Sequence, residues 1–568
     1  MPYQPMIAGT RYMISAGHYL ATQAGFDILE AGGNAIDAGV AAGIALGVVQ
    51  SDIVQVPGVA PIMIRLAETG EVLTISGLGW WPKAASLELF VEQHGGTIPT
   101  GLIRTVVPAA PDAWITALQR YGTMSFGEVS AAAIRFAREG FAMHPWMTQY
   151  IESCVDAYRE WPTNAAIYLP DGKPPQPGEL FVQTDLARSL QFMADQEAAA
   201  SSDGRDAGLN AARDAFYRGD LASEIVRFHA ENGGLLTAED MAEFRVGVEP
   251  PVKVAFQGTD VYTCGPWCQG PVLAQMLSLL DGYDLNELGH NSPQYIHLLT
   301  EAMKLSFADR ERYYGDPRFV DVPMETLLSA DYAAKRREMI DWERAYPEMP
   351  PAGEAGEGGT GASYPPSDGG PGLAADTSYV CVVDGQGNAF SATPSDVSFE
   401  GPVIPGTGFC PSSRGSQSFA IPGHASSVAP GKRPRLTPNP ALAVREGEFV
   451  MPFGTPGGDA QTQGMLQVFL NRQVFGMNVQ EAVEAPRFVT HSFPNSFEPH
   501  KYFPGRLEVE GRVAAGDTDR LADLGHQVTR LDDLAQGVAG ICIIEADRKT
   551  GQLSGGADPR RPSRAMGW

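Results

Sequence analysis

The stretch LAADTSYVCVVDGQGNAFSATPSD, residues 373–396, changes character within a few positions. Two β-prone runs, Tyr379–Val383 and Ala389–Thr393, flank the turn residues DGQG and predict a β-hairpin. Immediately upstream, residues 347–375 are rich in Gly, Pro, Ala and Glu and hold too few apolar side chains to offset the entropy of ordering. We therefore expect a mobile segment that leads into a buried hairpin, with Thr377 at the junction.

This junction has two interpretations. It is either a domain linker followed by a strand, or a point at which the chain cuts itself before Thr377. A cut there would leave a threonine whose own α-amine, with a pKa of about 7.7–8, can take the proton of its hydroxyl group. Before the cut, the same hydroxyl can attack the carbonyl of Asp376 in an N-to-O acyl shift, and the ester then hydrolyses. Composition alone leaves both interpretations open.

Composition narrows the classes of protein. The 568-residue chain carries a formal net charge of −26, which disfavours nucleic acid and anionic membrane surfaces as partners. Six cysteines are too few for a disulfide framework, and Cys264 and Cys268 have neither a second pair nor a nearby His for zinc, so we expect buried small side chains. No metal or cofactor is indicated. The N-terminus lacks a basic segment followed by an apolar run, which favours a cytoplasmic location.

Apolar periodicity and capping residues predict the main helices. Residues 17–31 form an amphipathic pattern, and Asn34 can cap an apolar helix over residues 35–49. Residues 126–140 and 292–314 are also expected to be helical. With these helices we expect a layered α+β body. The strand candidates are Val72–Ile75, Val252–Phe256, Tyr379–Val383, Ala389–Thr393, Phe449–Pro452 and Gly540–Ile544.

Longer blocks carry a family resemblance. ADTSYVCVVDGQGNAFSAT resembles the processing-site signature of the γ-glutamyltransferase family, in which a Thr begins the small subunit. Blocks in the family's order include ILEAGGNAIDAGVAAGIALGVVQ, EAMKLSFADRERYYGDPRFV, GKRPRLTPNPAL, FGTPGGDAQTQGMLQVFLN, EAPRF and GGADPR. Because the blocks cover nearly the whole chain, it is identified as a member of this superfamily of N-terminal-nucleophile hydrolases.

The resemblance implies a fold and a subunit organisation. The fold would be an α+β, four-layer α/β/β/α sandwich made as one precursor. The cut between Asp376 and Thr377 would give a large subunit, residues 1–376, and a small catalytic subunit, residues 377–568. The subunits would stay together as a heterodimer, and pairing into a heterotetramer is left open. The substrate would be a small-molecule amide, and no cofactor is implied.

Four catalytic residues follow from the same motifs. Thr377 would be the nucleophile for both the cut and the later reaction. Ser395 stands where the family has a second Thr that hydrogen-bonds the nucleophile. Gly457 and Gly458 match the diglycine whose backbone N–H groups form the oxyanion hole, where close approach and fixed donors stabilise a tetrahedral anion.

The residues that would hold an amino-acid substrate depart from the family pattern. Ser86 replaces the Arg that grips an α-carboxylate, and Val397 replaces an Asn. Ser416 and Gln417 replace the paired acids for an α-ammonium, and Leu436 and Thr437 replace a pair of Ser. Leaving a substrate's ammonium and carboxylate unpaired in a closed pocket would cost roughly a few kcal/mol each. The pattern therefore predicts an acyl group without an α-ammonium.

Two branches of the superfamily fit that description, one similar to cephalosporin acylases, which remove glutaryl-type groups, and one similar to oxamate amidohydrolase. Arg414, Arg433 and Arg435 are each able to meet an acyl carboxylate, although a surface or structural role is the more common one for such an arginine. Two alternatives stay open: a glutathione hydrolase, that is a γ-glutamyl hydrolase or transferase, with a different clamp, or an uncleaved binding protein. The candidate substrate-binding residues are Ser86, Val397, Arg414, Gln417, Arg435 and Thr437.

Overall fold

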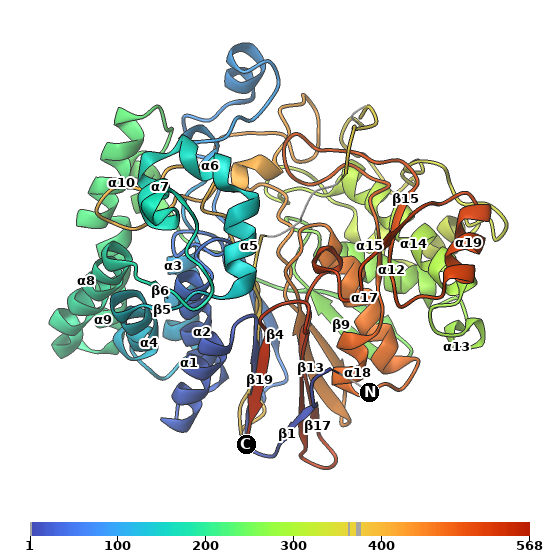
Figure 1. The fold of residues 1–568 in the computed structure, drawn as a ribbon, viewed down its shortest axis with the longest axis horizontal. Coiled ribbons are helices and arrows are strands. Elements are labelled where there is room, and N and C mark those ends of the chain that lie inside the picture. The colour runs from blue at the N-terminus through green and yellow to red at the C-terminus, as the bar shows by residue number, and fades with distance from the viewer. Residues whose placement is uncertain (1–2, 362–363, 371–375) are drawn as a thin grey trace.

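Two antiparallel, seven-stranded sheets lie face to face at the centre of the molecule, and helices cover the outer face of each (Figure 1). The computed structural model describes residues 3–361, 364–370 and 376–568. The four layers confirm the predicted α/β/β/α sandwich, and both sheets combine strands from the two ends of the chain. The strands β1 and β19, which come from opposite ends of the chain, lie side by side in the lower part of Figure 1.

One sheet contains the predicted hairpin. Its strands, in spatial order, are β19 (Arg564–Gly567), β2 (Met13–Ala16), β10 (Val380–Val383), β11 (Ala389–Ala392), β3 (Ile62–Arg65), β4 (Val72–Ile75) and β7 (Val248–Glu249). The hairpin of β10 and β11 pairs Val380 with Ala392 and Val383 with Ala389. It lies at the centre of the sheet, because β2 pairs with its first strand and β3 with its second.

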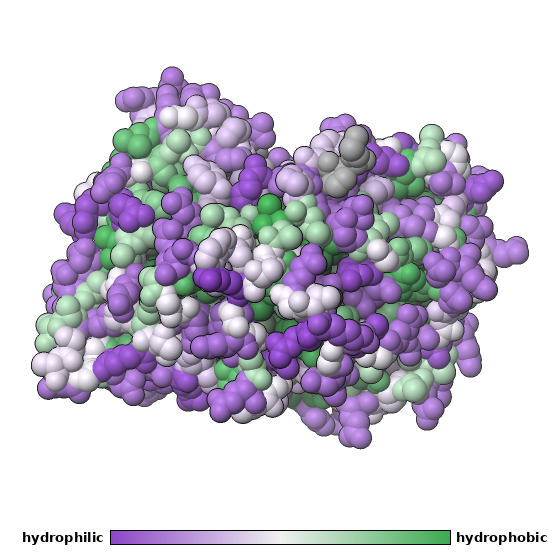
Figure 2. Space-filling view, turned by 90° about the horizontal axis from the view of Figure 1, so that it is seen from below, coloured by the Kyte–Doolittle hydropathy of each residue, from purple (hydrophilic) through white to green (hydrophobic). Residues whose placement is uncertain are grey.

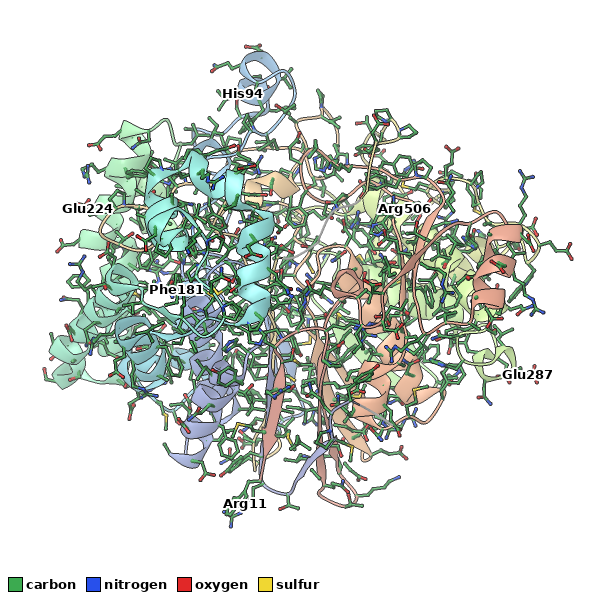
Figure 3. All side chains as sticks on the ribbon, viewed as in Figure 1. Arg11, His94, Phe181, Glu224, Glu287 and Arg506 are labelled. Carbon is green, nitrogen blue, oxygen red and sulfur yellow. The ribbon has the colours of Figure 1, made fainter. Side chains whose placement is uncertain are left out.

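The second sheet carries the diglycine at the end of a central strand. Its order is β1 (Ile7–Gly9), β18 (Leu553–Ala557), β17 (Cys542–Asp547), β13 (Phe449–Gly454), β12 (Ala441–Arg445), β9 (Thr259–Thr263) and β8 (Val252–Phe256). Side chains such as Met13, Tyr379, Leu442 and Ile544 fill the space between the two sheets and exclude solvent from it. Figure 3 shows side chains packed throughout these layers, while labelled peripheral residues such as Glu224 and Glu287 lie at the outside.

The helices form two groups. On the hairpin side lie α1 (Tyr19–Glu30), α2 (Ala35–Val49), α3 (Ala110–Tyr121), α4 (Phe126–Glu139), α5 (Pro145–Ser153), α6 (Val155–Glu160), α7 (Pro162–Tyr168), α8 (Thr184–Ala200), α9 (Arg205–Tyr217), α10 (Asp220–Glu231) and α11 (Ala238–Glu243). On the other side lie α12 (Gly270–Leu280), α13 (Leu285–Leu288), α14 (Pro293–Tyr313), α15 (Met324–Leu327), α16 (Ala330–Arg337), α17 (Ala460–Gln473), α18 (Val479–Glu484) and α19 (Ala515–Asp523). Two small sheets, β5–β6 (Phe141–Ala142, Leu180–Phe181) and β14–β15–β16 (Phe488–Thr490, Arg506–Glu510, Gln527–Leu531), complete the fold.

The helix α2 positions the hairpin. Asn34 accepts hydrogen bonds from the backbone of Ile36 and Asp37, and the Asp37 carboxylate accepts one from Asn34 N at 3.0 Å, which completes a capping box. Every residue of α2 is buried, as the apolar sequence predicts. A Cβ at Gly39 would lie 2.1 Å from the ring of Phe390 on β11, so only glycine permits this close packing.

The acidic segment before the hairpin is described in part. Residues 347–361 follow the body of the protein as an irregular chain, and hydrogen bonds such as Gly353 N to Asp309 (2.9 Å) and Gly359 N to Arg312 O (2.8 Å) attach them to α14. Residues 364–370 are also irregular, and Ser367 N donates to Tyr502 O at 2.8 Å. The predicted mobility of residues 347–375 stays a prediction, and residues 362–363 and 371–375 lie outside the described part.

The two neighbouring cysteines are buried, and the surface is largely hydrophilic. Cys264 and Cys268 are both buried and free, as predicted. Hydrophilic residues dominate the face shown in Figure 2, where hydrophobic residues are interspersed in small areas. Among the described residues, the helices are all too short or too polar to cross a membrane.

Candidate active site

Thr377 lies directly before β10 and is fully buried. Its backbone N–H donates to Ile53 O at 3.1 Å, in the loop that follows α2, and Ser378 N donates to Pro394 O at 2.9 Å. The φ angle of Thr377 is 90°, a region that β-branched residues rarely adopt and that costs on the order of 1–3 kcal/mol. The backbone of Thr377 is therefore strained at the place where the sequence predicts the cut.

The Thr377 hydroxyl contacts the predicted helper residue. Thr377 Oγ1 lies 2.6 Å from Ser395 Oγ, and Ser395 N donates to Val59 O at 2.9 Å. Arg414 donates a short hydrogen bond to the same Ser395 Oγ. Because a guanidinium can only donate, Ser395 Oγ serves as the acceptor of that bond and stays oriented toward Thr377.

Arg414 also binds the residue on the other side of the scissile bond. Its Nη1 lies 2.6 Å from Asp376 Oδ2, and its Nε lies 3.4 Å from Asp396 Oδ1. Burial alone would lower the pKa of Arg414, but Asp376 and Asp396 raise it above its ordinary value. Arg414 thus stays charged and joins Asp376, Ser395 and Asp396.

Asp396 fixes the segment that carries Arg414. Its carboxylate accepts hydrogen bonds from Ser412 Oγ at 2.6 Å and from Ser413 N at 3.1 Å. Burial raises the pKa of Asp396 to about 6, against the opposing effects of Arg414 and the two serines. These contacts explain how a loop distant in sequence places a guanidinium beside the hairpin.

The diglycine lies between β13 and α17. Gly457 and Gly458 have φ angles of 121° and 52°, and Gln269 Nε2 donates to Gly458 O at 2.8 Å. Within the described part of the chain, neither glycine N–H has a hydrogen-bond acceptor. Two oriented, unused N–H groups are the feature that an oxyanion hole requires.

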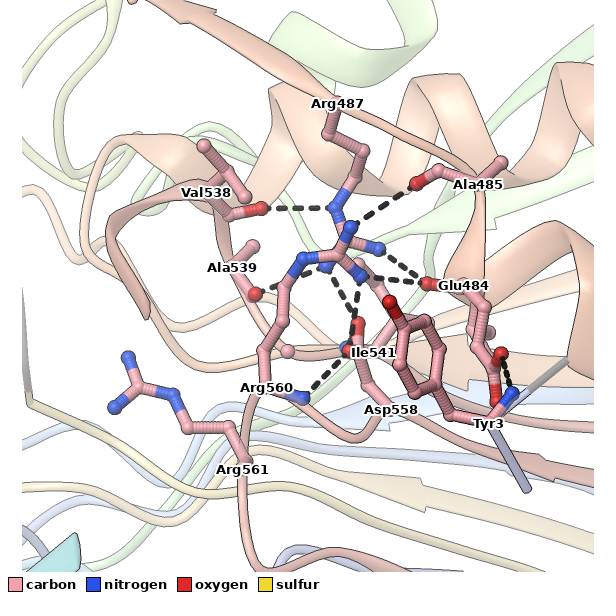
Figure 4. A network of polar contacts seen from close by, with 12 residues as sticks. Tyr3, Glu484, Ala485, Arg487, Val538, Ala539, Ile541, Asp558, Arg560 and Arg561 are labelled. Carbon is pink, nitrogen blue, oxygen red and sulfur yellow. Dashed lines mark hydrogen bonds and ion pairs between the residues drawn. The ribbon is translucent and has the colours of Figure 1, made fainter. Parts of the chain in front are cut away.

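A buried ionic network, drawn in Figure 4, holds a loop that packs against this turn. Arg487 donates to Val538 O and Ala539 O at 3.0 Å each, and its Nη2 lies 2.5 Å from Asp558 Oδ2. The loop that Arg487 holds packs against the diglycine, because a Cβ at Gly457 would lie 3.4 Å from Ala539 Cα. Arg560 continues the network by pairing with Asp558 at 3.0 Å and with Glu510 at 2.6 Å. The EAPRF and GGADPR motifs therefore meet in space.

A pocket opens beside the junction. Its empty volume is about 810 Å³, part of it open to solvent. Of the predicted residues, Asp376, Val397, Arg414 and Gly458 line it. The other lining residues are Tyr150, Phe399, Glu400, Ser413, Asn495, Phe497, Glu498, Pro499 and Lys501.

The remaining predicted substrate-binding residues do not line this pocket in the described part of the chain. Arg435 Nη2 pairs with Glu311 at 2.7 Å. Gln417 Nε2 donates to Thr437 Oγ1 at 2.8 Å, and both residues are buried. Ser86 Oγ accepts from Leu89 N at 3.2 Å. Arg433, the third arginine of the region, pairs with Asp316 at 3.0 Å and with Glu249 at 2.6 Å. Its charge is therefore used within the protein.

Sequence reasoning missed two acidic residues beside the junction, Asp52 and Asp396. Asp52 precedes Ile53, is completely buried and has no hydrogen-bond partner for either carboxylate oxygen among the described residues. Burial raises its pKa to about 7, and the nearby Arg561 opposes this shift. The only sequence signal for Asp52 was a charged residue directly before the apolar pair Ile53 and Val54 in QSDIV.

One group of potential metal ligands lies elsewhere in the described chain. His297, Glu301 and His526 bring their ligand atoms within 4.8 Å of one another. However, His297 Nδ1 lies 2.9 Å from His526 Nε2, and Lys304 Nζ pairs with Glu301 at 2.7 Å. The two histidines contact each other and Glu301 pairs with Lys304, so we interpret the group as buried polar contacts.

A buried threonine at the head of a strand, within a four-layer α/β/β/α sandwich, defines the class of N-terminal-nucleophile hydrolases. The model of the gamma-glutamyltranspeptidase family matches residues 21–568, and the chain belongs to this family. This confirms the resemblance and shows that the protein is an enzyme, an amide hydrolase or transferase of the N-terminal-nucleophile type.

Proteins with established names are similar to this chain over nearly its whole length. The chain is 34% identical to an acylase ACY 1 proenzyme of Pseudomonas sp. strain SE83, over 97% of this chain and 93% of the relative. It is 32% identical to the glutathione hydrolase-like YwrD proenzyme of Bacillus subtilis strain 168, over 99% of both. It is 30% identical to an oxamate amidohydrolase proenzyme of Klebsiella pneumoniae, over 98% of this chain and 99% of the relative.

A solved structure agrees with these relatives. The cephalosporin acylase from Bacillus halodurans superimposes with a TM-score of 0.87 at 29% identity, over 100% of this chain and 98% of that one. The branches named from the sequence motifs are thus among the relatives.

Proposed function

We propose that this protein is a self-processing amidohydrolase that uses Thr377 to form an acyl-enzyme, and that its acyl group carries a carboxylate without an α-ammonium. The observation that carries this proposal is the position of Arg414, which reaches both Ser395 and the pocket. After the proposed cut, Asp376 is free to leave, and Arg414 becomes available to a substrate anion. An arginine is well suited to bind a carboxylate through charge-assisted hydrogen bonds.

The first reaction would be the cut itself. The Thr377 hydroxyl attacks the Asp376 carbonyl, the C–N bond breaks, and the nitrogen takes the hydroxyl proton to become an α-amine. Water then hydrolyses the ester and releases the large subunit's C-terminus, to give subunits of residues 1–376 and 377–568. The Thr377 φ of 90° favours this step, because breaking the peptide bond relieves the strain.

The second reaction repeats the chemistry on a substrate. The α-amine of Thr377 takes the hydroxyl proton, and the oxygen attacks the amide carbonyl. The N–H groups of Gly457 and Gly458 would stabilise the oxyanion, while Ser395 orients the nucleophile. The leaving amine departs with a proton, and water hydrolyses the ester.

A second candidate has a specific observation in its favour. Glu400 and Glu498 line the pocket, and either is able to hold the ammonium of a γ-glutamyl group in place of the missing acid pair. Glu400 is already paired with Arg104 at 3.0 Å, which leaves Glu498 as the stronger candidate. We rank this function second, because the rest of the amino-acid clamp is absent from the sequence.

Release of a chromogenic amine from matched glutaryl and γ-glutamyl anilides decides between the two. The first function predicts a higher kcat/KM for the glutaryl compound. A clear preference for γ-glutamyl would establish the second function instead.

A further inference from the structure

The residue before the scissile bond occupies the pocket. Asp376 lines it together with Val397 and Gly458, and its carboxylate lies 2.6 Å from Arg414 Nη1. The two side chains are only 9% and 2% exposed, so this ion pair is largely shielded from water. In the uncut chain, the guanidinium assigned above to a substrate carboxylate therefore binds a carboxylate of the chain itself.

The chemistry of the cut relates the contact between Asp376 and Arg414 to substrate binding. In the ester intermediate, the Asp376 carbonyl carbon is bonded to Thr377 Oγ1, and the old bond to nitrogen is broken. An acyl-enzyme formed from a substrate has the same connectivity at the same oxygen. The ester of the cut is thus a first acyl-enzyme, and its acyl group is an aspartyl group.

An aspartyl group has a fixed length. Two carbons, Cα and Cβ, separate its acyl carbon from its carboxylate carbon, which is the spacing of a succinyl group. A glutaryl or γ-glutamyl group places its carboxylate one carbon farther away, and the oxalyl group that oxamate would give has no intervening carbon. One C–C bond is about 1.5 Å long. If neither end moves, a shorter acyl group would therefore lose the 2.6 Å hydrogen bond, and a longer one would press its carboxylate into the guanidinium.

We propose that Asp376 marks the acyl pocket, and that the processed enzyme selects four-carbon ω-carboxyacyl amides, the succinyl class, whose carboxylate binds Arg414. This inference rests on the function proposed above and specifies its substrate. The substrate's carboxylate replaces that of Asp376 on Arg414, and its acyl carbon takes the place of the Asp376 carbonyl carbon. The backbone amide on Cα of Asp376 has no counterpart in a succinyl group.

The test is a chain-length series on the processed wild-type enzyme. The substrates are 4-nitroanilides of malonyl, succinyl, glutaryl and adipyl half-acids, with butyryl as the uncharged match of succinyl and γ-glutamyl as the amino-acid control. We expect kcat/KM to be highest for succinyl, by about tenfold or more over each neighbour, as one methylene commonly contributes.

The outcomes separate the inference from the function. Hydrolysis of carboxylated anilides with a maximum at another length, or with no maximum, would overturn the inference and leave the proposed function intact. A preference for γ-glutamyl or for butyryl would overturn both. Calorimetric binding of free malonate, succinate and glutarate gives a ranking that is independent of the leaving group, and succinate should bind tightest.

Arg414→Lys supplies the matched variant. A lysine keeps the charge but loses the fork of donors, so it should reduce the succinyl rate and the preference over butyryl together. Arg227→Lys is the matched control, because it makes the same exchange at an exposed arginine outside the pocket. This variant should keep the wild-type chain-length profile, whereas an Arg414→Lys enzyme that keeps the same profile would contradict the inference.

Discussion

Thr377 Oγ1 and Ser395 Oγ lie 2.6 Å apart, although 18 residues separate them in the sequence. The hairpin of β10 and β11 brings them together, because Thr377 precedes its first strand and Ser395 follows its second. Ser395 is itself held by the backbone of Val59 and by Arg414. Ser395, which Val59 and Arg414 hold in place, thus orients the hydroxyl of the proposed nucleophile, Thr377.

Substitution of Ser395 tests this orientation. Ser395→Ala removes one hydrogen bond to the nucleophile and leaves Arg414 without that acceptor, a loss of about 1–2 kcal/mol. We expect kcat to fall roughly 5- to 30-fold, with slower self-cleavage measured by electrophoresis over time. Ser395→Thr keeps the hydroxyl and should retain most of the activity. Equal rates for Ser395→Ala and the wild type would show that the contact has no role.

Gly457 tests the oxyanion hole. Gly457→Ala places a side chain at a φ of 121°, which L-residues rarely adopt, so the turn must change and its N–H groups move. Loss of one oxyanion donor typically reduces kcat by about 10²–10³-fold. The measurement is kcat for a processed sample. Gly447→Ala, at a surface turn with a φ of 71° and open space around it, is the matched control for backbone strain and should leave kcat unchanged.

Arg487 tests the support behind the diglycine. Arg487→Met leaves Asp558 with one guanidinium fewer and frees the carbonyls of Val538 and Ala539. Breaking a buried pair in this way costs about 3–5 kcal/mol. We expect the free energy of unfolding, measured in urea, to fall by that amount and kcat to fall as well. Arg227→Met, which removes an exposed pair with Glu224, should change stability by less than about 1 kcal/mol.

The four helices that were predicted from the sequence, at residues 17–31, 35–49, 126–140 and 292–314, are all present, because their signals are local. Asn34 caps its helix as predicted, and α14 begins one residue after the predicted start at 292. Val72–Ile75 and Val252–Phe256 match strands β4 and β8 at both ends. Strands such as β18 (LSGGA) were missed, because glycine-rich segments have low strand propensity and their pairing comes from neighbours far along the chain.

In the candidate site, too, some residues could be predicted from local sequence and others depend on contacts in the fold. Thr377, Ser395 and the diglycine belong to motifs that are readable without a structure. The sequence could not tell which of Arg414, Arg433 and Arg435 reaches the pocket, because that depends on the residues that each one pairs with in the fold. Arg433 and Arg435 pair with acids 117 and 124 residues away, whereas Arg414 reaches the pocket.

Asp52 predicts a dependence of stability on pH. Its pKa is raised by burial from 3.8 to about 7, so the folded protein keeps this proton while the unfolded chain loses it near pH 4. The stabilisation from Asp52 is therefore complete below about pH 4 and is lost as the pH rises toward 7. In the uncut Thr377→Ala protein, adding Asp52→Asn should remove this decline, as measured by urea unfolding at several pH values. Parallel pH curves for the two proteins would contradict the assignment.

The central claim is that the chain cuts itself before Thr377, and intact-mass analysis with N-terminal sequencing of the purified protein tests it most directly. We predict two fragments, the smaller beginning with TSYVCVV, for the wild type and for Thr377→Ser, and a single full-length chain for Thr377→Ala. A wild-type protein that stays full length and still hydrolyses an amide, or fragments that begin at another residue, would contradict the account.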